Sequence, residues 1–440
     1  MLKRWFCGTV LAVTLLLGHP AARAQGVAPI PDTPFYQDYH EAYPLKTPAE
    51  NDVRALAFDA GGRLWTATGA GVRYLENGQW KTPEGGAALG PTYALYRDAR
   101  GQIWVGAWNG LYRATPEKVS PAGIAGTPIG AIRGRRNGAE ETIFAAGPHG
   151  IWRSEKGTWN KIKGAWQTAI RTLLPTSDDR LWIGTASGLY LQELSGPQPA
   201  STRYSRPDVV LSSNIYALTE LPDGTFCIAS TGGLDFYRGT QRVRSLTAKD
   251  GMPNRQARAV ARDADGRLWV ATKLGVARYD NGRWSLRHSR RWLLSDDARD
   301  VVIGPDGTAW VATAAGVDAI QRKRMTLAEK ADYFLKMLRA RHIRPPGLVG
   351  PAALVTPGDL SRSFIEDDDN DGEHTGMYCA MESMRYAVTQ DPTARENAKA
   401  AFHALRVLQQ ATGTPHFIAR SVLPLGTAPR HEVDRTFTPQ

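Results

Sequence analysis

The sequence predicts a mainly β protein, a seven-bladed β-propeller followed by a small α-helical segment. A segment of the type Leu-Trp-x-x-Thr-x-x-Gly, followed by apolar residues, recurs along the chain about every 40 residues. Asp-Gly and Asn-Gly turns separate the apolar runs within the copies. This period and these short runs are typical of four-stranded propeller blades.

The repeat occurs seven times, which predicts seven blades. One aromatic position is shared by the copies and is occupied by Trp65, Trp104, Phe144, Trp182, Phe226, Trp269 and Trp310. Because large apolar side chains at equivalent positions are usually core, we expect these residues to pack between blades rather than to bind a ligand.

Each copy is predicted to form strands joined by tight turns. Residues 53–58 and 64–68 form the first two strands of the first copy, and Asp59–Gly62 makes the turn between them. Asp accepts hydrogen bonds from the local backbone in such a turn, and Gly adopts the positive φ that it requires. Asn77-Gly78 predicts the hairpin that leads to the fourth strand.

The ends of the repeat region predict how the ring closes. After Ile320 the pattern becomes helical, so the seventh copy lacks a fourth strand of its own. The extended aromatic segment Pro34–Tyr39 precedes the first copy without a partner. We expect this segment to complete the seventh blade and leave no open sheet edge.

Residues 1–24 have the features of a signal peptide, with Lys3 and Arg4 before an apolar run and Ala22-Arg23-Ala24 at the cleavage site. We expect a propeller over residues 25–322 and a helical segment over 323–440. No later apolar run reaches the ~20 residues of a membrane helix. A secreted or periplasmic protein is therefore expected, with no transmembrane segment after cleavage.

The chain is basic, and removing the three cations of the signal lowers its formal charge from +11 to +8. A basic surface could favour acidic glycans as partners, but a solvated surface kept soluble by excess Arg is the favoured explanation of the charge. Export and the lack of a clustered basic helix argue against nucleic acid. The two remaining cysteines, Cys227 and Cys379, are too far apart in sequence to suggest a disulfide framework.

The repeated Leu-Trp-[Ile/Val]-[Gly/Ala]-Thr core, with Asp250–Asn254 before the sixth copy, resembles two-component-regulator propeller repeats. The resemblance covers about residues 27–320, and Phe144 and Phe226 depart from its pattern. It implies a ligand-binding, sensor-type propeller that acts outside the cell. No kinase segment follows, so any signalling output would need a separate partner.

The resemblance also implies a ligand site at the mouth of the ring, where the loops between strands two and three meet the loops between blades. The candidate residues in these loops are Trp108, Asn109, His149, Asn214, Asn254, Arg255 and Lys273. A tryptophan face beside amide and cationic groups suits a glycan or a peptide. Simple packing of the mouth is the alternative interpretation.

The C-terminal segment predicts three helices. The first starts at a capping box, Thr326–Glu329, with an apolar face of Leu327, Ala331, Phe334, Leu335 and Leu338. The second covers residues 377–388. The third follows Asp391-Pro392 and ends before Gly413, with an inward face of Ala394, Ala398, Ala401, Phe402, Leu405 and Leu408.

An acidic stretch, Glu366–His374, precedes the second of these helices. Asp367, Asp369 and Asp371 match the first half of an EF-hand loop, but the twelfth position is Tyr378 instead of a carboxylate. A full EF-hand is therefore not expected. A weaker calcium site and a solvated acidic loop both remain open.

The stretch DDDNDGEHTGMYCAMESMRYAVTQDPTARENAKAAFHAL resembles the opening hairpins of the (α/α)₆ toroid of carbohydrate-active enzymes. The resemblance implies that Asp369 lies in a sugar cleft and that Asp371, Glu373 and His374 would be the catalytic candidates of an enzyme. Because a toroid needs some 300 residues, we expect this segment to be truncated and inactive. A secreted ligand-binding or sensing module is favoured, and the front part of a polysaccharide hydrolase or lyase is the alternative. Calcium is the one cofactor that the sequence suggests.

Overall fold

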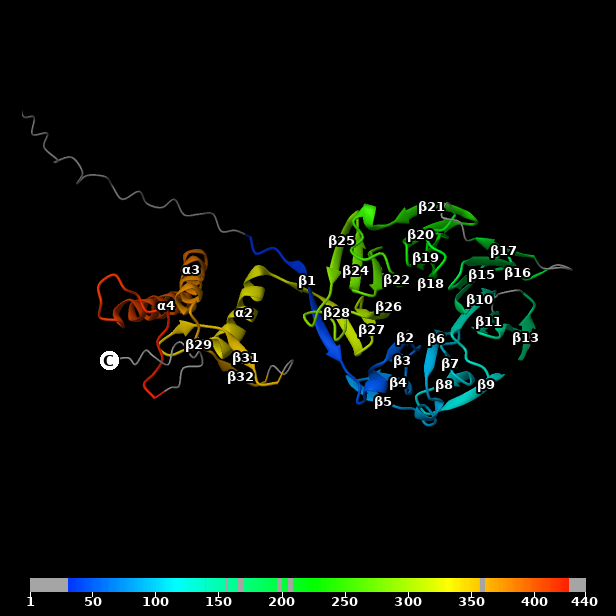
Figure 1. The fold of residues 1–440 in the computed structure, drawn as a ribbon, viewed down its shortest axis with the longest axis horizontal. Coiled ribbons are helices and arrows are strands. Elements are labelled where there is room, and N and C mark those ends of the chain that lie inside the picture. The colour runs from blue at the N-terminus through cyan, green and yellow to red at the C-terminus, as the bar shows by residue number, and fades with distance from the viewer. Residues whose placement is uncertain are drawn as a thin grey trace, which may run out of the picture. The chain divides into compact units, whose positions relative to one another are not determined.

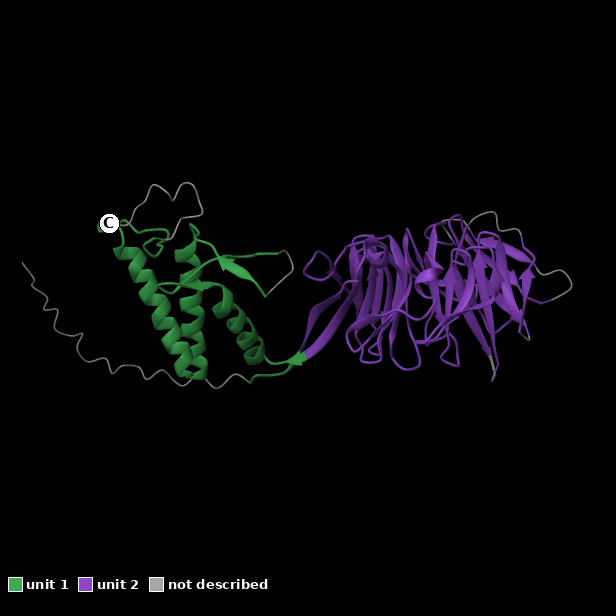
Figure 2. Ribbon diagram, turned by 90° about the horizontal axis from the view of Figure 1, so that it is seen from below, with its two compact units in different colours: residues 1–35, 324–440 green, residues 36–323 purple. Residues whose placement is uncertain are grey.

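The computed structural model describes residues 31–138, 140–155, 157–164, 169–195, 200–204, 209–356 and 361–426 (Figure 1). The predicted signal peptide, residues 1–24, lies outside the described residues. The chain divides into two compact units, residues 36–323 and residues 1–35 with 324–440 (Figure 2).

The larger unit is a seven-bladed β-propeller, as the repeat predicts, with antiparallel four-stranded sheets arranged in a ring (Figure 1). The first three blades contain β2 (Val53–Phe58), β3 (Leu64–Thr68), β4 (Gly71–Glu76) and β5 (Gln79–Lys81); β6 (Thr92–Arg97), β7 (Ile103–Ala107), β8 (Gly110–Ala114) and β9 (Val119–Ala125); and β10 (Ala131–Asn137), β11 (Glu140–Gly147), β12 (Gly150–Glu155) and β13 (Thr158–Ile162).

Blades four to six follow the same plan. They contain β14 (Ile170–Pro175), β15 (Arg180–Thr185), β16 (Leu189–Glu193) and β17 (Ser201–Tyr204); β18 (Ile215–Glu220), β19 (Phe226–Ser230), β20 (Gly233–Arg238) and β21 (Gln241–Leu246); and β22 (Ala257–Arg262), β23 (Leu268–Thr272), β24 (Gly275–Asp280) and β25 (Arg283–Arg287). Short helical turns also occur in this unit: α1 (Pro48–Asn51), η1 (Ala87–Leu89) and η2 (Ala248–Asp250).

The seventh blade contains the two ends of the ring. Its sheet order is β1-β28-β27-β26, with β1 (Phe35–Tyr43), β28 (Gly316–Met325), β27 (Ala309–Thr313) and β26 (Ala298–Ile303). The segment before the first repeat therefore supplies the missing fourth strand, which confirms the predicted closure. On β1, His40 Nε2 lies 2.7 Å from the buried carboxylate of Asp318 on β28.

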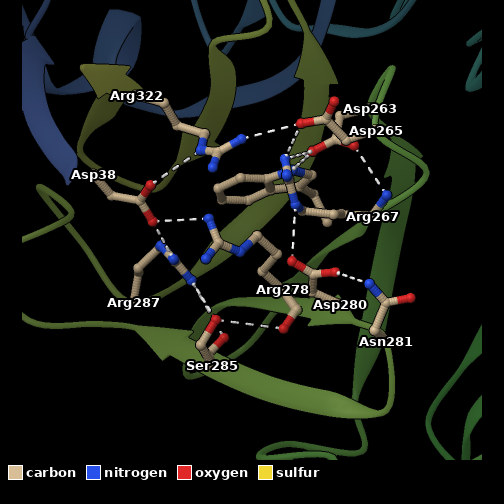
Figure 3. Close-up of polar contacts among 11 residues, drawn as sticks. Asp38, Asp263, Asp265, Arg267, Arg278, Asp280, Asn281, Ser285, Arg287 and Arg322 are labelled. Atoms are coloured by element: carbon tan, nitrogen blue, oxygen red, sulfur yellow. Dashed lines mark hydrogen bonds and ion pairs between the residues drawn. The ribbon is translucent and has the colours of Figure 1, made fainter. Parts of the chain in front are cut away.

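A cluster of arginines fixes the closing strand against blade six (Figure 3). Asp38 on β1 accepts hydrogen bonds from Arg278, at 2.8 Å, and from Arg287. Arg322 Nε on β28 lies 3.6 Å from the same carboxylate. The Arg278 and Arg287 guanidinium carbons lie 5.3 and 5.1 Å from the ring centre of Trp269. One carboxylate thus faces three cations where the ring closes.

The recurrent tryptophans connect the predicted turns to the core. The indole N–H of Trp65 donates to Asp59 at 2.9 Å, and Asp59 Oδ1 also accepts from the backbone N–H groups of Gly61 and Arg63. Trp104 and Trp269 make the same contact with Asp98 and Asp263. Trp65, Phe144, Trp182 and Trp269 are fully buried, as expected, whereas Trp104 and Trp310 are only half-buried.

The smaller unit contains α2 (Leu327–Arg341), α3 (Asp371–Thr389), α4 (Pro392–Gln410) and two short hairpins, β29 (Ile343–Arg344) with β30 (Leu348–Val349) and β31 (Ala352–Leu354) with β32 (Ser363–Ile365). The predicted capping box of Thr326 and Glu329 is present at α2. Asp391 caps α4 and accepts from Thr393 N at 2.8 Å.

Two expectations for the helices were wrong. Helix α3 begins at Asp371 instead of Met377, because the carboxylates of Asp371 and Glu373 favour a helix N-terminus although Gly372 and Gly376 have low helix propensity. The inward faces also differ. Leu327 and Phe334 of α2 are 67% and 54% exposed, and Phe402 of α4 is 55% exposed. Leu335, Ala394, Ala401 and Leu408 are buried as expected, and Ala404, which was not predicted, is buried with them.

Candidate ligand site at the mouth of the central channel

A cavity of about 590 Å³ is lined by residues of the first strand of every blade. In six of these strands the register shifts at the second residue, which forms a β-bulge. A bulge bends the strand and redirects its side chain. The bulge residues, which all line the cavity at one mouth of the channel, are Arg54, Tyr93, Arg171, Tyr216, Arg258 and Arg299.

Three of these arginines form an arc of ion pairs across blades six, seven and one. Arg258 Nη1 lies 2.7 Å from Asp297, whose other oxygen lies 3.2 Å from Arg299 Nε. Arg299 also pairs with Asp52, which lies 2.6 Å from Arg54 Nη2. The arc contains three cations and two carboxylates and so carries a net positive charge.

The tyrosines continue the ring through contacts with arginine. The Arg54 guanidinium lies 5.0 Å from the ring centre of Tyr93, in the next blade. The Arg171 guanidinium lies 4.5 Å from that of Tyr216, also in the next blade. Such cation–π contacts help to hold the two arginines in place.

Blade three departs from this pattern. Gly130 immediately precedes β10 and lines the same mouth, and its backbone N–H donates to Ala146 O at 2.8 Å. Further along β10, Arg133 points into the cavity and donates to Ile132 O at 2.9 Å. Burial lowers the pKa of Arg133, and the charge of Asp300 on β26 opposes this effect.

Asp300 is the carboxylate next to Arg299 on the channel wall. It accepts hydrogen bonds from the backbone N–H groups of Leu56 and Val301, each at 2.9 Å. Burial raises the pKa of Asp300 to about 6, although both backbone N–H groups oppose the shift. The channel wall therefore carries a carboxyl group whose pKa lies well above that of a solvated aspartate.

Only one of the loop residues predicted from the sequence contacts the ring. Asn214 accepts a hydrogen bond from Arg171 Nη1. The backbone N–H of Trp108 donates to Pro91 O at 2.9 Å, two residues before Tyr93 of the ring. The Trp108 side chain is 51% exposed and lies directly over Gly90.

The other predicted loop residues lie outside the channel. Asn109 accepts from the hydroxyl of Tyr112 at 2.9 Å, and Asn254 accepts from Gln256 N at 2.8 Å, so both stabilise their own loops. His149, Arg255 and Lys273 are exposed. Along the described chain, the lining of the channel cavity includes none of these five residues, and their roles in binding stay predictions.

The ring itself was missed from the sequence, although the repeat carries its signal. Each blade begins with an apolar or small residue, and the next residue is Arg or Tyr in every blade except the third. Aligning the repeats on this first strand, instead of on the tryptophan of the second, would have revealed it.

The three catalytic candidates of the smaller unit lie in different environments. Asp371 is fully buried and pairs with Arg344 and with Ser421 Oγ, which lies 2.6 Å away. Glu373 lines one surface pocket with Asp369, whereas His374 lines another with His342. The structure therefore does not gather Asp371, Glu373 and His374 around one cavity.

The possible calcium residues are also dispersed. Asp371 is engaged by Arg344, and Asp369 Oδ2 lies 3.1 Å from Arg420 Nη1. Asp367 is buried. Within the ranges that the structure describes, no group of three or more His, Cys, Asp or Glu side chains is arranged to hold a metal ion. Calcium binding by these carboxylates therefore stays a prediction.

Comparisons with known proteins agree with this fold. Residues 251–273, which span the start of blade six, match the family model for the two component regulator propeller. The chain thus carries a two-component-regulator propeller repeat in this blade. No curated protein matches the chain.

Solved structures with the same fold include the extracellular domain of a putative hybrid two component system from Bacteroides thetaiotaomicron, with a TM-score of 0.54 and 16% identity over 64% of this chain and 39% of that one. Virginiamycin B lyase from Staphylococcus aureus has a TM-score of 0.52 and 14% identity over 65% of this chain and 99% of that one. At these identities the likeness concerns the fold alone. In the described chain, no helix is both long and apolar enough to cross a membrane.

Proposed function

We propose that this chain is a ligand-binding module of the sensing type, exported from the cytoplasm, that recognises an acidic glycan at the mouth of its channel. The observation that carries the proposal is the ring of bulge residues, four arginines and two tyrosines, around one cavity. Guanidinium groups form bidentate hydrogen bonds with carboxylates, which makes Arg suited to acidic ligands.

The aromatic groups favour a glycan over a peptide. Tyr93 and Tyr216 line the cavity, each with an arginine over its ring. Trp108 adds a half-exposed indole on the same face of the propeller. Flat aromatic surfaces next to polar groups suit the apolar face and hydroxyl groups of a sugar ring. A cavity of about 590 Å³ falls in the range of small-ligand sites.

Two features of the sequence support an extracytoplasmic role. Residues 1–24 have the pattern of a signal peptide, and blade six matches a repeat named for two-component regulators. The extracellular domain of a hybrid two component system has the same fold. We propose that this chain reports ligand binding to a separate signalling partner.

A titration of the exported protein with trigalacturonate and with neutral galactotriose tests the proposal. We expect heat release on binding of the acidic trisaccharide, with an affinity that falls as ionic strength rises, because exposed charges are screened by salt. Binding of both sugars with equal affinity, or of neither, would contradict recognition of an acidic glycan. Release of new reducing ends from the trisaccharide would instead favour the enzyme alternative.

A further inference from the structure

The arginines of the channel differ in whether a carboxylate neutralises them. Arg54, Arg258 and Arg299 share Asp52 and Asp297 in the arc of ion pairs. Arg171 contacts the Asn214 amide oxygen and the face of Tyr216, and Arg133 donates to a backbone carbonyl. Among the residues that the structure describes, neither of these two has a carboxylate within ion-pair distance.

These two arginines come from adjacent blades, beside the one interruption of the ring that the described residues show. Gly130 takes the place that Arg or Tyr occupies in the other blades, and a Cβ atom there would meet no other atom within 4 Å. The missing side chain leaves an opening in the ring. Arg133 lies three residues beyond Gly130, which at about 3.3 Å per residue places it roughly 10 Å deeper in the channel.

The acidic groups nearest to Arg133 do not satisfy it. Asp300 acts on the Arg133 pKa without a direct contact, and its own oxygens accept from two backbone N–H groups. The hydroxyl of Tyr96 donates to Glu141 at 2.6 Å. A buried cation without a paired anion is costly, and a bound carboxylate would offset that cost.

We infer that blades three and four hold the charged groups of the ligand. The glycan enters over Gly130, Arg171 binds one carboxylate at the rim, and Arg133 binds a second carboxylate deeper in the channel. The arc of Arg54, Arg258 and Arg299, already neutralised in large part, positions the neutral sugar surface. This inference rests on the proposed function and adds which residues recognise the acidic groups.

The test compares the affinity for trigalacturonate of the wild-type chain and three variants, at constant ionic strength. Arg171→Gln removes the rim cation, and Gly130→Leu fills the opening without adding charge. Arg283→Gln is the matched control, because Arg283 is an exposed arginine at the start of β25 in blade six. Thermal melts establish that each variant is folded. Gly130 and Arg283 adjoin open space, and Arg171 lines the cavity.

We expect Arg171→Gln to weaken binding about ten-fold, as for a lost charge-assisted pair. Gly130→Leu should weaken it at least as much, and Arg283→Gln should stay within about two-fold of wild type. Wild-type binding that survives both Arg171→Gln and Gly130→Leu would overturn the assignment to blades three and four but leave the proposed function intact. Absence of wild-type binding would overturn both.

Discussion

Asp38 on the closing strand lies 2.8 Å from Arg278 of blade six, although 240 residues separate them in the sequence. The same carboxylate also faces Arg287 and Arg322. Blade six has no such cluster at its other border in the described chain, so these contacts belong to the closure of the ring. One acidic side chain therefore holds the closing strand β1 of blade seven against blade six.

We expect Asp38→Asn to destabilise the propeller by about 3 kcal/mol, because it leaves three largely buried arginines without their shared carboxylate. Chemical denaturation followed by tryptophan fluorescence measures the change. Asp265→Asn is the control, since Asp265 pairs with Arg267 and Arg322 but is largely exposed. Equal losses for the two variants would mean that closure does not depend on Asp38.

Asp300 predicts a dependence of stability on pH. Its pKa is raised in the fold to about 6, so the folded state binds this proton more tightly than the unfolded chain does. The associated stability is present below about pH 4 and is lost as the pH rises through 6, an effect on the order of 2–3 kcal/mol. Thermal melts from pH 4 to 7.5 should show a steeper decline for wild type than for Asp300→Asn. Parallel curves would contradict the assignment.

We expect loss of the Trp108 indole to weaken ligand binding and loss of the Trp65 indole to weaken the fold. Trp108→Ala should weaken trigalacturonate binding about five-fold without a change in melting temperature, because its side chain is half-exposed above the mouth. Trp65→Phe should lower the melting temperature, since it removes a buried hydrogen bond to Asp59. A stability loss in Trp108→Ala would show that this residue only packs its loop.

Two neighbouring carboxylates of the smaller unit should differ in how much they contribute to its stability. Asp371→Asn should destabilise this unit by about 3 kcal/mol, because it leaves Arg344 buried without an anion. Glu373→Gln should change stability by less than about 1 kcal/mol, since Glu373 is exposed in the first turn of α3. The rate at which thermolysin cleaves the helical unit measures the stability of both variants. A shared catalytic role would instead leave the stability of both variants unchanged.

Most of the propeller could be predicted because each blade repeats the same local signals. The Asp59 turn, the Trp65 position and the unpaired segment before the first blade each have a direct structural counterpart. The helical unit was harder to predict, because burial there depends on which helices pack together. Phe402 has the right spacing for the core, yet Ala404 takes the buried position.

The candidate site could be predicted only in part. The sequence indicated the correct face of the ring through Asn214 and Trp108. It did not indicate the bulges that turn Arg54 and Arg171 into the channel, since a bulge depends on strand register and not on composition. Nor could it show that Glu373 and His374, adjacent in sequence, line different pockets.

The most direct test of the central claim is a structure of the chain with bound trigalacturonate. Our account predicts ligand density within the ring of arginines and tyrosines, with one carboxylate in contact with Arg171 and the sugar chain passing over Gly130. Density on the helical unit, or on the outer rim of the blades with an empty channel, would contradict it.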